Sequence, residues 1–254
     1  MACRAHCIPL AATSLLLSAS SAAIAGTYVD NFDSGLVNPT YWTIDTTEGS
    51  TLTPVNGRLE MVQGTGPMVG SGAHLIFNFA ITGDFTVDVD YQLLNWPANN
   101  YERVGISTGA PYPVTTALAA VARGSDPNYQ FNENYASFFY GTGWPYVQFF
   151  TESTDMSGRL RMERVGQTMS GYYWKDSAWV LIGSHANASQ LVPITGLTFG
   201  IWDFTSDTPG VKVAFDNFAL NAPGTDIPLV PEPETWAMLI AGLGLLGLKL
   251  RRGT

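Results

Sequence analysis

Two aspartates two positions apart, Asp88 and Asp90, come closest to a catalytic spacing in this sequence. Hydrolysis of a glycosidic bond uses two carboxyl groups, one as acid and the other as nucleophile or base. Both aspartates belong to an alternating segment in which Phe85, Val87 and Val89 would face a core, so they would share the solvent side of one strand. We therefore interpret them as surface charges that keep a sheet soluble.

Other reactive side chains are scattered. Four more carboxylates could form a pair only if the fold brought them together: Glu133, Glu152, Asp155 and Glu163. His74 and His185 are isolated from each other and from acidic runs, which argues against a zinc site or a Ser-His-Asp triad and favours structural or surface histidines. Both cysteines, Cys3 and Cys7, lie in the first seven residues, so the body can form no disulfide and no thiolate centre.

Aromatic side chains are concentrated between residues 129 and 150, where ten rings fall in 22 positions. Sugars present CH-rich faces that stack on Trp and Tyr, so an aromatic-lined concave sheet would be a platform for a glycan. About half of these rings must be buried, because the cores of β-sandwiches are themselves aromatic. We expect the rings in loops to be exposed, and these carbohydrate-binding candidates are Trp96, Trp144 and Tyr146.

The composition limits what kind of protein could position these residues. The chain has 254 residues with 26 Gly, 15 Pro and 13% charged residues, which suits one sizeable β-rich domain with short appendages. Its formal charge of −9 repels phosphate backbones, so we expect no nucleic-acid partner.

Apolar residues recur with a period of two between residues 26 and 221, and breaks fall every eight to twelve residues. This spacing predicts an all-β, two-sheet antiparallel sandwich. The strongest hairpin joins 51–55 to 58–62 through Asn56-Gly57, which suits a type I′ turn. A three-stranded meander follows over 160–165, 169–174 and 179–182, and we expect the last strands at 197–204 and 211–220.

The N-terminal segment reads as an export signal. Residues 1–25 contain an apolar run and end in Ala23-Ile24-Ala25, the small-x-small pattern that a signal peptidase cuts, so we predict cleavage after Ala25. The alternative, a transmembrane anchor, fits less well because the run is short and interrupted by Pro9. At the other end of the body, the Pro/Gly-rich residues 222–230 are expected to form a linker.

The C-terminal segment, 231–254, begins with Pro231-Glu232-Pro233, continues as an apolar stretch over 236–250 and ends near Arg251-Arg252. We expect a short transmembrane helix over 236–250, with the basic pair on the cytoplasmic side. This order of features resembles the PEP-CTERM sorting signal of Gram-negative, exopolysaccharide-producing bacteria. The resemblance implies transient anchoring in the inner membrane, recognition by an exosortase-type protease, and removal or processing of the tail. An ordinary C-terminal anchor is the alternative.

A second resemblance covers the body. Asp30-Asn31-Phe32, Trp42, the Asn-Gly hairpin, the meander and the final Asp216-Asn217-Phe218 together resemble the concanavalin A-like lectin/glucanase superfamily. The resemblance implies a jelly-roll sandwich whose first and last strands are neighbours. Retaining glucanases of that superfamily use Glu-x-Asp-x-x-Glu on one strand, but here the last position is Leu93, so the acid/base residue is missing.

The same resemblance implies one structural Ca²⁺ near the chain ends, held by an aspartate of the last strand and by main-chain carbonyls. Asp216 is the matching residue, and the carbonyl of Gly57 could supply another oxygen. The apolar alternation over 211–215 changes phase before Phe218, which predicts a bulge or bend at Asp216. The alternative is that Asp216 caps a turn through its own backbone.

These observations predict an exported protein of the cell surface or biofilm matrix that binds or scaffolds extracellular polysaccharide without catalysis. One alternative is a glycoside hydrolase or lyase that acts on that polysaccharide through an unrecognised carboxylate arrangement. The other is a purely structural matrix or adhesion protein.

Overall fold

The computed structural model describes residues 26–47, 49–64, 72–108, 119–141, 143–186, 194–203 and 210–228; at 140, 141, 143–146 and 203 it describes the backbone alone. The expected signal peptide (1–25) and sorting segment (231–254), including the expected helix over 236–250, lie outside these residues. Within the described ranges, no helix is long and apolar enough to cross a membrane.

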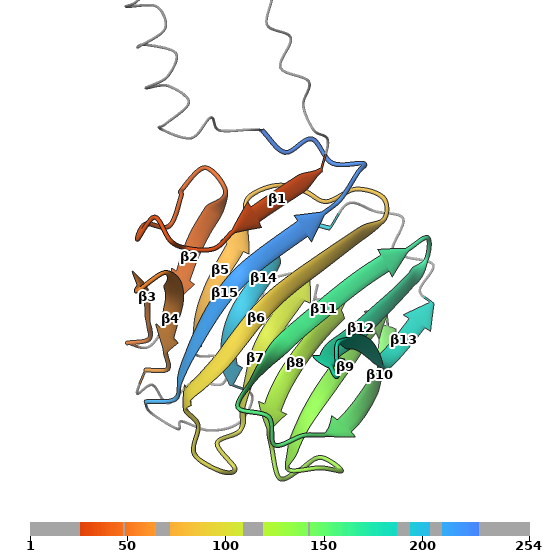
Figure 1. The fold of residues 1–254 in the computed structure, drawn as a ribbon. Helices are drawn as coiled ribbons and strands as arrows, with labels where there is room; N and C mark the ends of the chain where they lie inside the picture. Colours follow the sequence, from red (N-terminus) through yellow and green to blue (C-terminus); the bar gives the residue numbers. More distant parts are fainter. Residues whose placement is uncertain are drawn as a thin grey trace, which may run out of the picture.

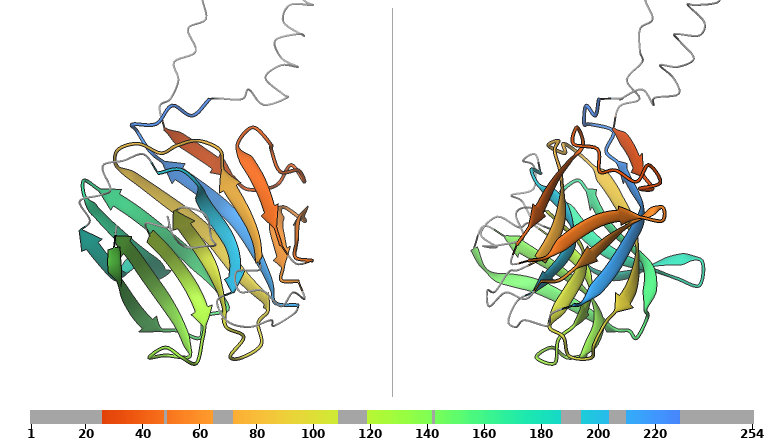
Figure 2. Two further views of the ribbon diagram at one scale, coloured as in Figure 1. Left: turned by 180° about the vertical axis from the view of Figure 1, so that it is seen from behind. Right: turned by 90° about the vertical axis from the view of Figure 1, so that its left-hand side faces the viewer.

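The described chain folds into two antiparallel sheets that face each other, as predicted (Figure 1). Sheet A contains, in spatial order, β13 (Ala178–Ala186), β12 (Thr168–Lys175), β11 (Ser157–Val165), β6 (Phe85–Asn95), β15 (Lys212–Asn221), β4 (Arg58–Val62) and β3 (Thr51–Val55), and β1 (Thr27–Asp30) also pairs with β15. Sheet B contains β10 (Gly143–Glu152), β9 (Glu133–Gly141), β8 (Ala119–Ser125), β7 (Glu102–Thr108), β14 (Leu197–Asp203), β5 (Gly72–Phe77) and β2 (Trp42–Thr46). The left view of Figure 2 shows the molecule from behind, with sheet B toward the viewer.

The alternation seen in the sequence determines which side chains enter the core. In β6, Val87 and Val89 are fully buried between the sheets, whereas Asp88 and Asp90 lie on the outer face of sheet A. The turns follow from local chemistry as well. Asn56 and Gly57 have φ values of 52° and 70°, the left-handed values that a type I′ hairpin requires, so the predicted β3–β4 hairpin is confirmed.

The first and last strands are neighbours, as the superfamily resemblance implied. β1 pairs with β15, with Asp30 opposite Phe218. The Asp30 carboxylate accepts hydrogen bonds from the Phe32 amide and the Trp42 indole, both at 2.9 Å. Phe218 packs edge-on against Trp42, with ring centroids 4.8 Å apart. The first Asp-Asn-Phe motif, at residues 30–32, therefore ends β1. The second, at residues 216–218, places the Phe218 ring in the core beside Trp42.

The body continues past Asn221 into the segment that the sequence suggested as a linker. Ala222 and Ile227 are buried in the core, and the Tyr41 hydroxyl donates a 2.5 Å hydrogen bond to the carbonyl of Pro228. Residues 222–228 therefore pack against the sandwich through Ala222 and Ile227, while Pro223, Gly224 and Pro228 stay exposed.

Two glycines opposite each other in sheet A set the distance between the sheets. Gly171 of β12 pairs with Gly183 of β13. A Cβ on Gly171 would lie 2.1 Å from the Ser137 Oγ and 2.6 Å from a Val121 methyl, and one on Gly183 would lie 2.2 Å from the Phe149 ring. The missing side chains therefore let β12 and β13 approach sheet B closely.

Replacing Gly171 with alanine should therefore destabilise the fold. Because the new methyl group must displace both Ser137 and Val121, we expect a loss of about 1–3 kcal/mol in the free energy of unfolding. Urea denaturation measures it. Ser184→Ala, an exposed change in the adjacent strand, is the control and should stay within about 0.5 kcal/mol of the wild type. Equal stability of Gly171→Ala and the wild type would contradict the close approach.

Candidate functional site

The outer face of sheet A carries the two aspartates that were weighed as catalytic residues. Arg161 holds Asp88 through two hydrogen bonds of 2.6 and 2.7 Å, and Arg159 holds Asp90 in the same two-pronged way. Each carboxylate is thus neutralised by the cation opposite it on β11. Glu163, further along the same face, accepts a 3.0 Å hydrogen bond from the Tyr172 hydroxyl.

The aromatic segment divides between two environments. Tyr135 and Phe139 enter the core between the sheets, whereas Phe138 lies on the opposite side of sheet B with Tyr129 and Phe150. Phe138 is only 3% exposed, so this second group is a packed cluster rather than an open platform. The sequence could predict the number of rings but not this division.

The three proposed carbohydrate-binding rings have different outcomes. Trp96 was expected to be an exposed loop residue, but it is half-buried, and its indole nitrogen donates a 3.2 Å hydrogen bond to Glu133. Arg123 lies over its ring at 5.8 Å from the centroid. Trp144 and Tyr146 belong to β10, and their side chains lie outside the described part of the structure.

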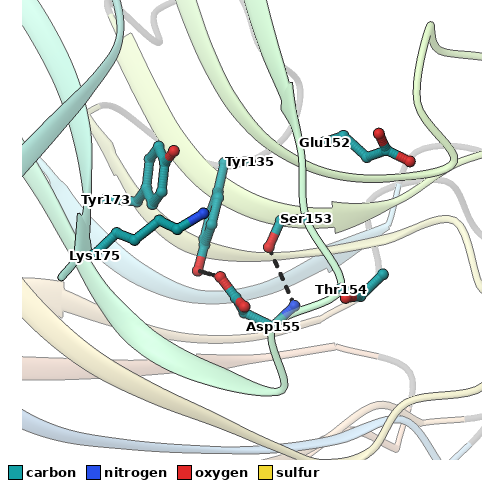
Figure 3. A pocket seen from close by; sticks show the side chains of 7 residues that line it. All are labelled: Tyr135, Glu152, Ser153, Thr154, Asp155, Tyr173 and Lys175. Carbon is teal, nitrogen blue, oxygen red and sulfur yellow. Dashed lines mark hydrogen bonds between the residues drawn. The ribbon is translucent and has the colours of Figure 1, made fainter.

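A polar cavity of about 310 Å³ opens where the end of β10 and the following loop meet β9 and β12 (Figure 3). It therefore lies between sheet B, which supplies β9 and β10, and sheet A, which supplies β12. Its lining residues are Tyr135, Glu152, Ser153, Thr154, Asp155, Tyr173 and Lys175. Two of the four carboxylates that the sequence left open, Glu152 and Asp155, are among them.

A chain of hydrogen bonds fixes the inner wall of the cavity. Tyr135 donates to Asp155 at 2.9 Å, and its oxygen lies 2.8 Å from the Tyr91 hydroxyl. Because the single Tyr135 proton goes to Asp155, Tyr91 must donate to Tyr135. Burial raises the pKa of Tyr135 to about 12, so the phenol stays protonated and keeps donating across the physiological range. The backbone of Asp155 is also fixed, because its amide donates a 3.1 Å hydrogen bond to Ser153 Oγ.

A buried arginine supports this loop from below. Arg123 is 1% exposed, and its Nε donates to the backbone carbonyl of Asp155 at 3.1 Å. It also forms an ion pair with Glu133. A buried cation needs such partners because water cannot solvate it. Glu133, another of the four open carboxylates, is therefore part of the support of the cavity rather than of its lining.

Strand β12 supplies Tyr173 and Lys175 to the opposite side of the cavity. The Tyr173 ring stacks on the Tyr135 ring with centroids 4.4 Å apart and an interplanar angle of 17°. Figure 3 shows Lys175 extending along this pair, and Glu152 directed away from Asp155. The cavity thus offers one fixed carboxylate, one ammonium group and two hydroxyl-bearing loop residues beside two buried, mutually stacked tyrosines. Such a set can bind a polyhydroxyl ligand, because it provides hydrogen-bond donors and acceptors.

The sequence pattern gives no indication of the role of Tyr173, Lys175 or Tyr135 in this cavity. The only local signal was Ser153-x-Asp155, a spacing that lets a serine cap the following turn. The residues of the cavity come from β9, β10 and β12, and a period-two pattern does not reveal that these strand ends meet.

The expected calcium ligand Asp216 lies on the outer face of sheet A, where it is paired in register with Asp90 of β6. The register between β15 and β6 shifts between Asp216 and Ala219, so the predicted bulge is confirmed. Burial, with the negative charges of Asp90 and Asp33, raises the pKa of Asp216. Asp33 approaches Gly57 so closely that a Cβ there would lie 2.5 Å from its Oδ1.

These oxygens are of the hard type that Ca²⁺ prefers, although among the described residues no three Asp, Glu, His or Cys side chains form a ready ligand set. Asp216 also accepts a 2.6 Å hydrogen bond from the Asn217 amide, as the turn-capping alternative requires. The calcium site therefore stays a prediction.

Metal removal tests this prediction. If Ca²⁺ binds between Asp216 and Asp33, EDTA should lower the melting temperature and excess Ca²⁺ should restore it. At a hundredfold excess over Kd, the bound ion adds about 2.7 kcal/mol to the free energy of unfolding. Asp216→Ala should abolish the response, whereas Asp226→Ala, an exposed carboxylate elsewhere, should retain it. A wild-type melting temperature that ignores both treatments would show that Asp216 only caps its turn.

His74 of β5 is a buried histidine. It is 1% exposed, and burial lowers its pKa to about 4, an effect that the opposite residue Asp45 on β2 only partly offsets. The imidazole is therefore neutral in the folded protein at neutral pH, consistent with the structural role expected from the sequence.

This burial makes stability depend on pH. Between about pH 6.5 and 4 the unfolded chain binds a proton that the folded protein does not, so stability is present above pH 6.5 and is lost as the pH falls. We expect a loss of up to about 1.4 kcal/mol per pH unit in urea denaturation between pH 6.5 and 5. His74→Gln should reduce the slope, and Val165→Ala, an exposed change that alters no titratable group, should not. Equal slopes in all three proteins would disprove the assignment.

The fold and the cavity together define an all-β jelly-roll sandwich of the lectin/glucanase kind. The family model described as the C domain of a protein of unknown function, DUF1583, matches residues 8–230, and the chain belongs to this family. The PEP-CTERM protein-sorting motif matches residues 229–252 and confirms the resemblance of the tail. The chain is therefore an exported protein that is sorted across the membrane, and the motif implies an exosortase-type processing partner.

Solved structures show the same fold at low sequence identity. The CBM2 module of the evolved Dit protein from Lactobacillus casei BL23 phage J-1 has a TM-score of 0.56 and 12% identity, over 81% of this chain and 99% of that one. A LamA variant from Zobellia galactanivorans, in complex with laminaritriose and laminaritetraose, has a TM-score of 0.54 and 15% identity over 79% and 100%. Lectin I-B4 from Griffonia simplicifolia has 0.52 and 13% over 77% and 98%. No curated protein matches the sequence.

Proposed function

We propose that this exported protein binds extracellular polysaccharide without cleaving it, and that the cavity lined by Tyr135, Asp155, Tyr173 and Lys175 holds a sugar unit of the chain. The observation that carries the proposal is the hydrogen-bonded series from Tyr91 through Tyr135 to Asp155, which fixes a carboxylate beside a stacked tyrosine wall. A carboxylate that is fixed before binding, with an ammonium group in the same cavity, can accept from and donate to the hydroxyl groups of a sugar ring.

The size and electrostatics of the cavity support binding of a small uncharged unit. A volume of about 310 Å³ is at the lower end of the range for small-molecule pockets. Asp155 and Lys175 offer one acceptor and one donor of opposite charge, which suits neighbouring hydroxyl groups better than a charged ligand. Tyr135 is protonated at neutral pH, as a phenol ordinarily is, and burial raises its pKa further, so the acceptor geometry of Asp155 is set before the ligand arrives.

The arrangement of carboxylates favours binding over hydrolysis. A glycosidase needs two carboxyl groups that face each other across the bond. Here Asp155 is engaged by Tyr135, and Glu152 is directed away from it (Figure 3). The carbohydrate-bound LamA variant and the lectin among the structural neighbours agree with a saccharide ligand, and their resemblance to this chain is one of fold.

Substitution of Asp155 tests the proposal. We expect Asp155→Ala to weaken binding about tenfold to hundredfold, because a hydrogen bond to a charged group contributes about 1.5–3 kcal/mol. Affinity electrophoresis against laminarin, dextran, xyloglucan and mannan measures the change. Tyr135→Phe removes the proton that orients Asp155 but keeps the ring wall, so it should weaken binding less.

Asp226→Ala, an exposed carboxylate outside the cavity, is the matched control and should bind as the wild type does. Unchanged affinity of a folded Asp155→Ala protein would reject the cavity as the site. Release of reducing sugar by the wild type, lost in Asp155→Ala, would replace the binding proposal with a hydrolytic one.

A further inference from the structure

The outer face of the β12–β13 hairpin carries an apolar patch that the cavity does not use. Trp174 lies directly opposite Trp179, and Tyr172 lies opposite Leu181, so all four side chains share one face. We call these four residues the hairpin patch. The right view of Figure 2 shows this teal hairpin projecting from the body of the sandwich. Trp174 is 40% exposed and Leu181 50% exposed.

The hairpin patch is held rigidly from below. The guanidinium of Arg161 lies over the Trp179 ring at 4.1 Å from its centroid, and Arg161 is itself fixed by its two hydrogen bonds to Asp88. Trp179 then supports Trp174 edge-on, with centroids 5.0 Å apart at 73°. An exposed indole that is held in place loses little conformational freedom when a ligand stacks on it.

The surface beside the hairpin patch is polar, and among its charged groups are two arginine–aspartate pairs and the Glu163 carboxylate, which accepts a hydrogen bond from Tyr172. Arg161 and Arg159 are paired with Asp88 and Asp90, so each cation on this part of sheet A has its own anion. An anionic polymer or a nucleic acid would need cations that are free of carboxylates. Paired donors and acceptors beside indole rings suit an uncharged chain that is rich in hydroxyl groups.

We propose that the hairpin patch is a second glycan-binding surface, which takes the face of an uncharged polysaccharide chain. Strand β12 separates the two sites, because Tyr173 and Lys175 line the cavity whereas Tyr172 and Trp174 belong to the patch. The two sites lie on opposite faces of one strand, so they bind separate sugar units, and the protein joins two polysaccharide chains. This cross-linking role rests on the proposed function of the cavity, but binding at the patch does not.

Two measurements test the proposal. Affinity electrophoresis against laminarin, dextran, xyloglucan and mannan reports binding, and turbidity of the same polymers reports cross-linking. The variants are Trp174→Ala, Trp174→Phe, Trp179→Ala and the cavity variant Asp155→Ala. Val165→Ala, an exposed apolar residue outside the patch, is the matched control, and circular dichroism checks that each variant is folded.

We expect Trp174→Ala to abolish turbidity and to reduce retardation at least threefold, while Trp174→Phe and Val165→Ala stay close to the wild type. Asp155→Ala should also lose turbidity but should keep the retardation that depends on Trp174. If Trp174→Ala loses retardation and Asp155→Ala does not, the result supports binding at the hairpin patch and rejects the cavity as a binding site. If only Asp155→Ala loses retardation, the result supports the cavity and rejects the hairpin patch.

Trp174→Ala with wild-type retardation and turbidity overturns the proposal, and so does a wild type that binds none of the four polymers. If Trp179→Ala does not fold, the decision rests on Trp174→Ala, whose exposed side chain can be removed without opening the core.

Discussion

The close approach of the two sheets at Gly171 and Gly183 is the constraint on which the functional end of this sandwich depends. With no side chain at either position, β12 and β13 pack directly against Ser137, Val121 and Phe149 of sheet B. The contact brings β12 near β9 and β10, and only then can a residue of each strand line the same cavity. Next to the glycine pair, between Gly171 and Tyr172, the register shifts. A bulge of this kind bends the strands and re-aims their side chains.

Polar groups at this end of the sandwich are held by partners rather than by water. Arg123 is buried, and its bonds to the Asp155 carbonyl and to Glu133 hold the loop that carries the cavity carboxylate. Tyr91 and Tyr135 add a second support through their hydroxyl groups. A ligand that binds Asp155 therefore meets a group whose position is already fixed, and the cost of ordering it has been met during folding.

The outer face of sheet A shows a different arrangement, in which charges meet in partly exposed pairs. Such pairs add little stability, because water and salt screen them. Their consequence here is that the charges of Arg159 and Arg161 are already matched by carboxylates, in a chain of formal charge −9, and that Arg161 is fixed beneath Trp179. The export and sorting of the chain place these faces outside the cytoplasm, where a protein that binds sugars on two sides of one strand would join polymers into a network.

The sequence by itself determined the local features. The period-two alternation in β6, the Asn56-Gly57 turn and the change of phase at Asp216 follow from neighbouring residues, and the structure confirms all three. The sorting motif is also local, because it is recognised as a short stretch of chain. The pairing of the first and last strands was predicted only through the superfamily resemblance of the two Asp-Asn-Phe motifs.

The tertiary structure alone decided which side chains meet. Asp155 and Tyr135 are 20 residues apart, and Tyr173 comes from the other sheet, so no pattern within one strand could show that they line one cavity. The division of the aromatic residues was equally hidden, because alternation shows that Tyr135 and Phe138 point to opposite faces but not which face is covered. Burial and contact between strands depend on how the two sheets stack, and that distance is set by glycines whose missing side chains leave no signal in a hydrophobic pattern.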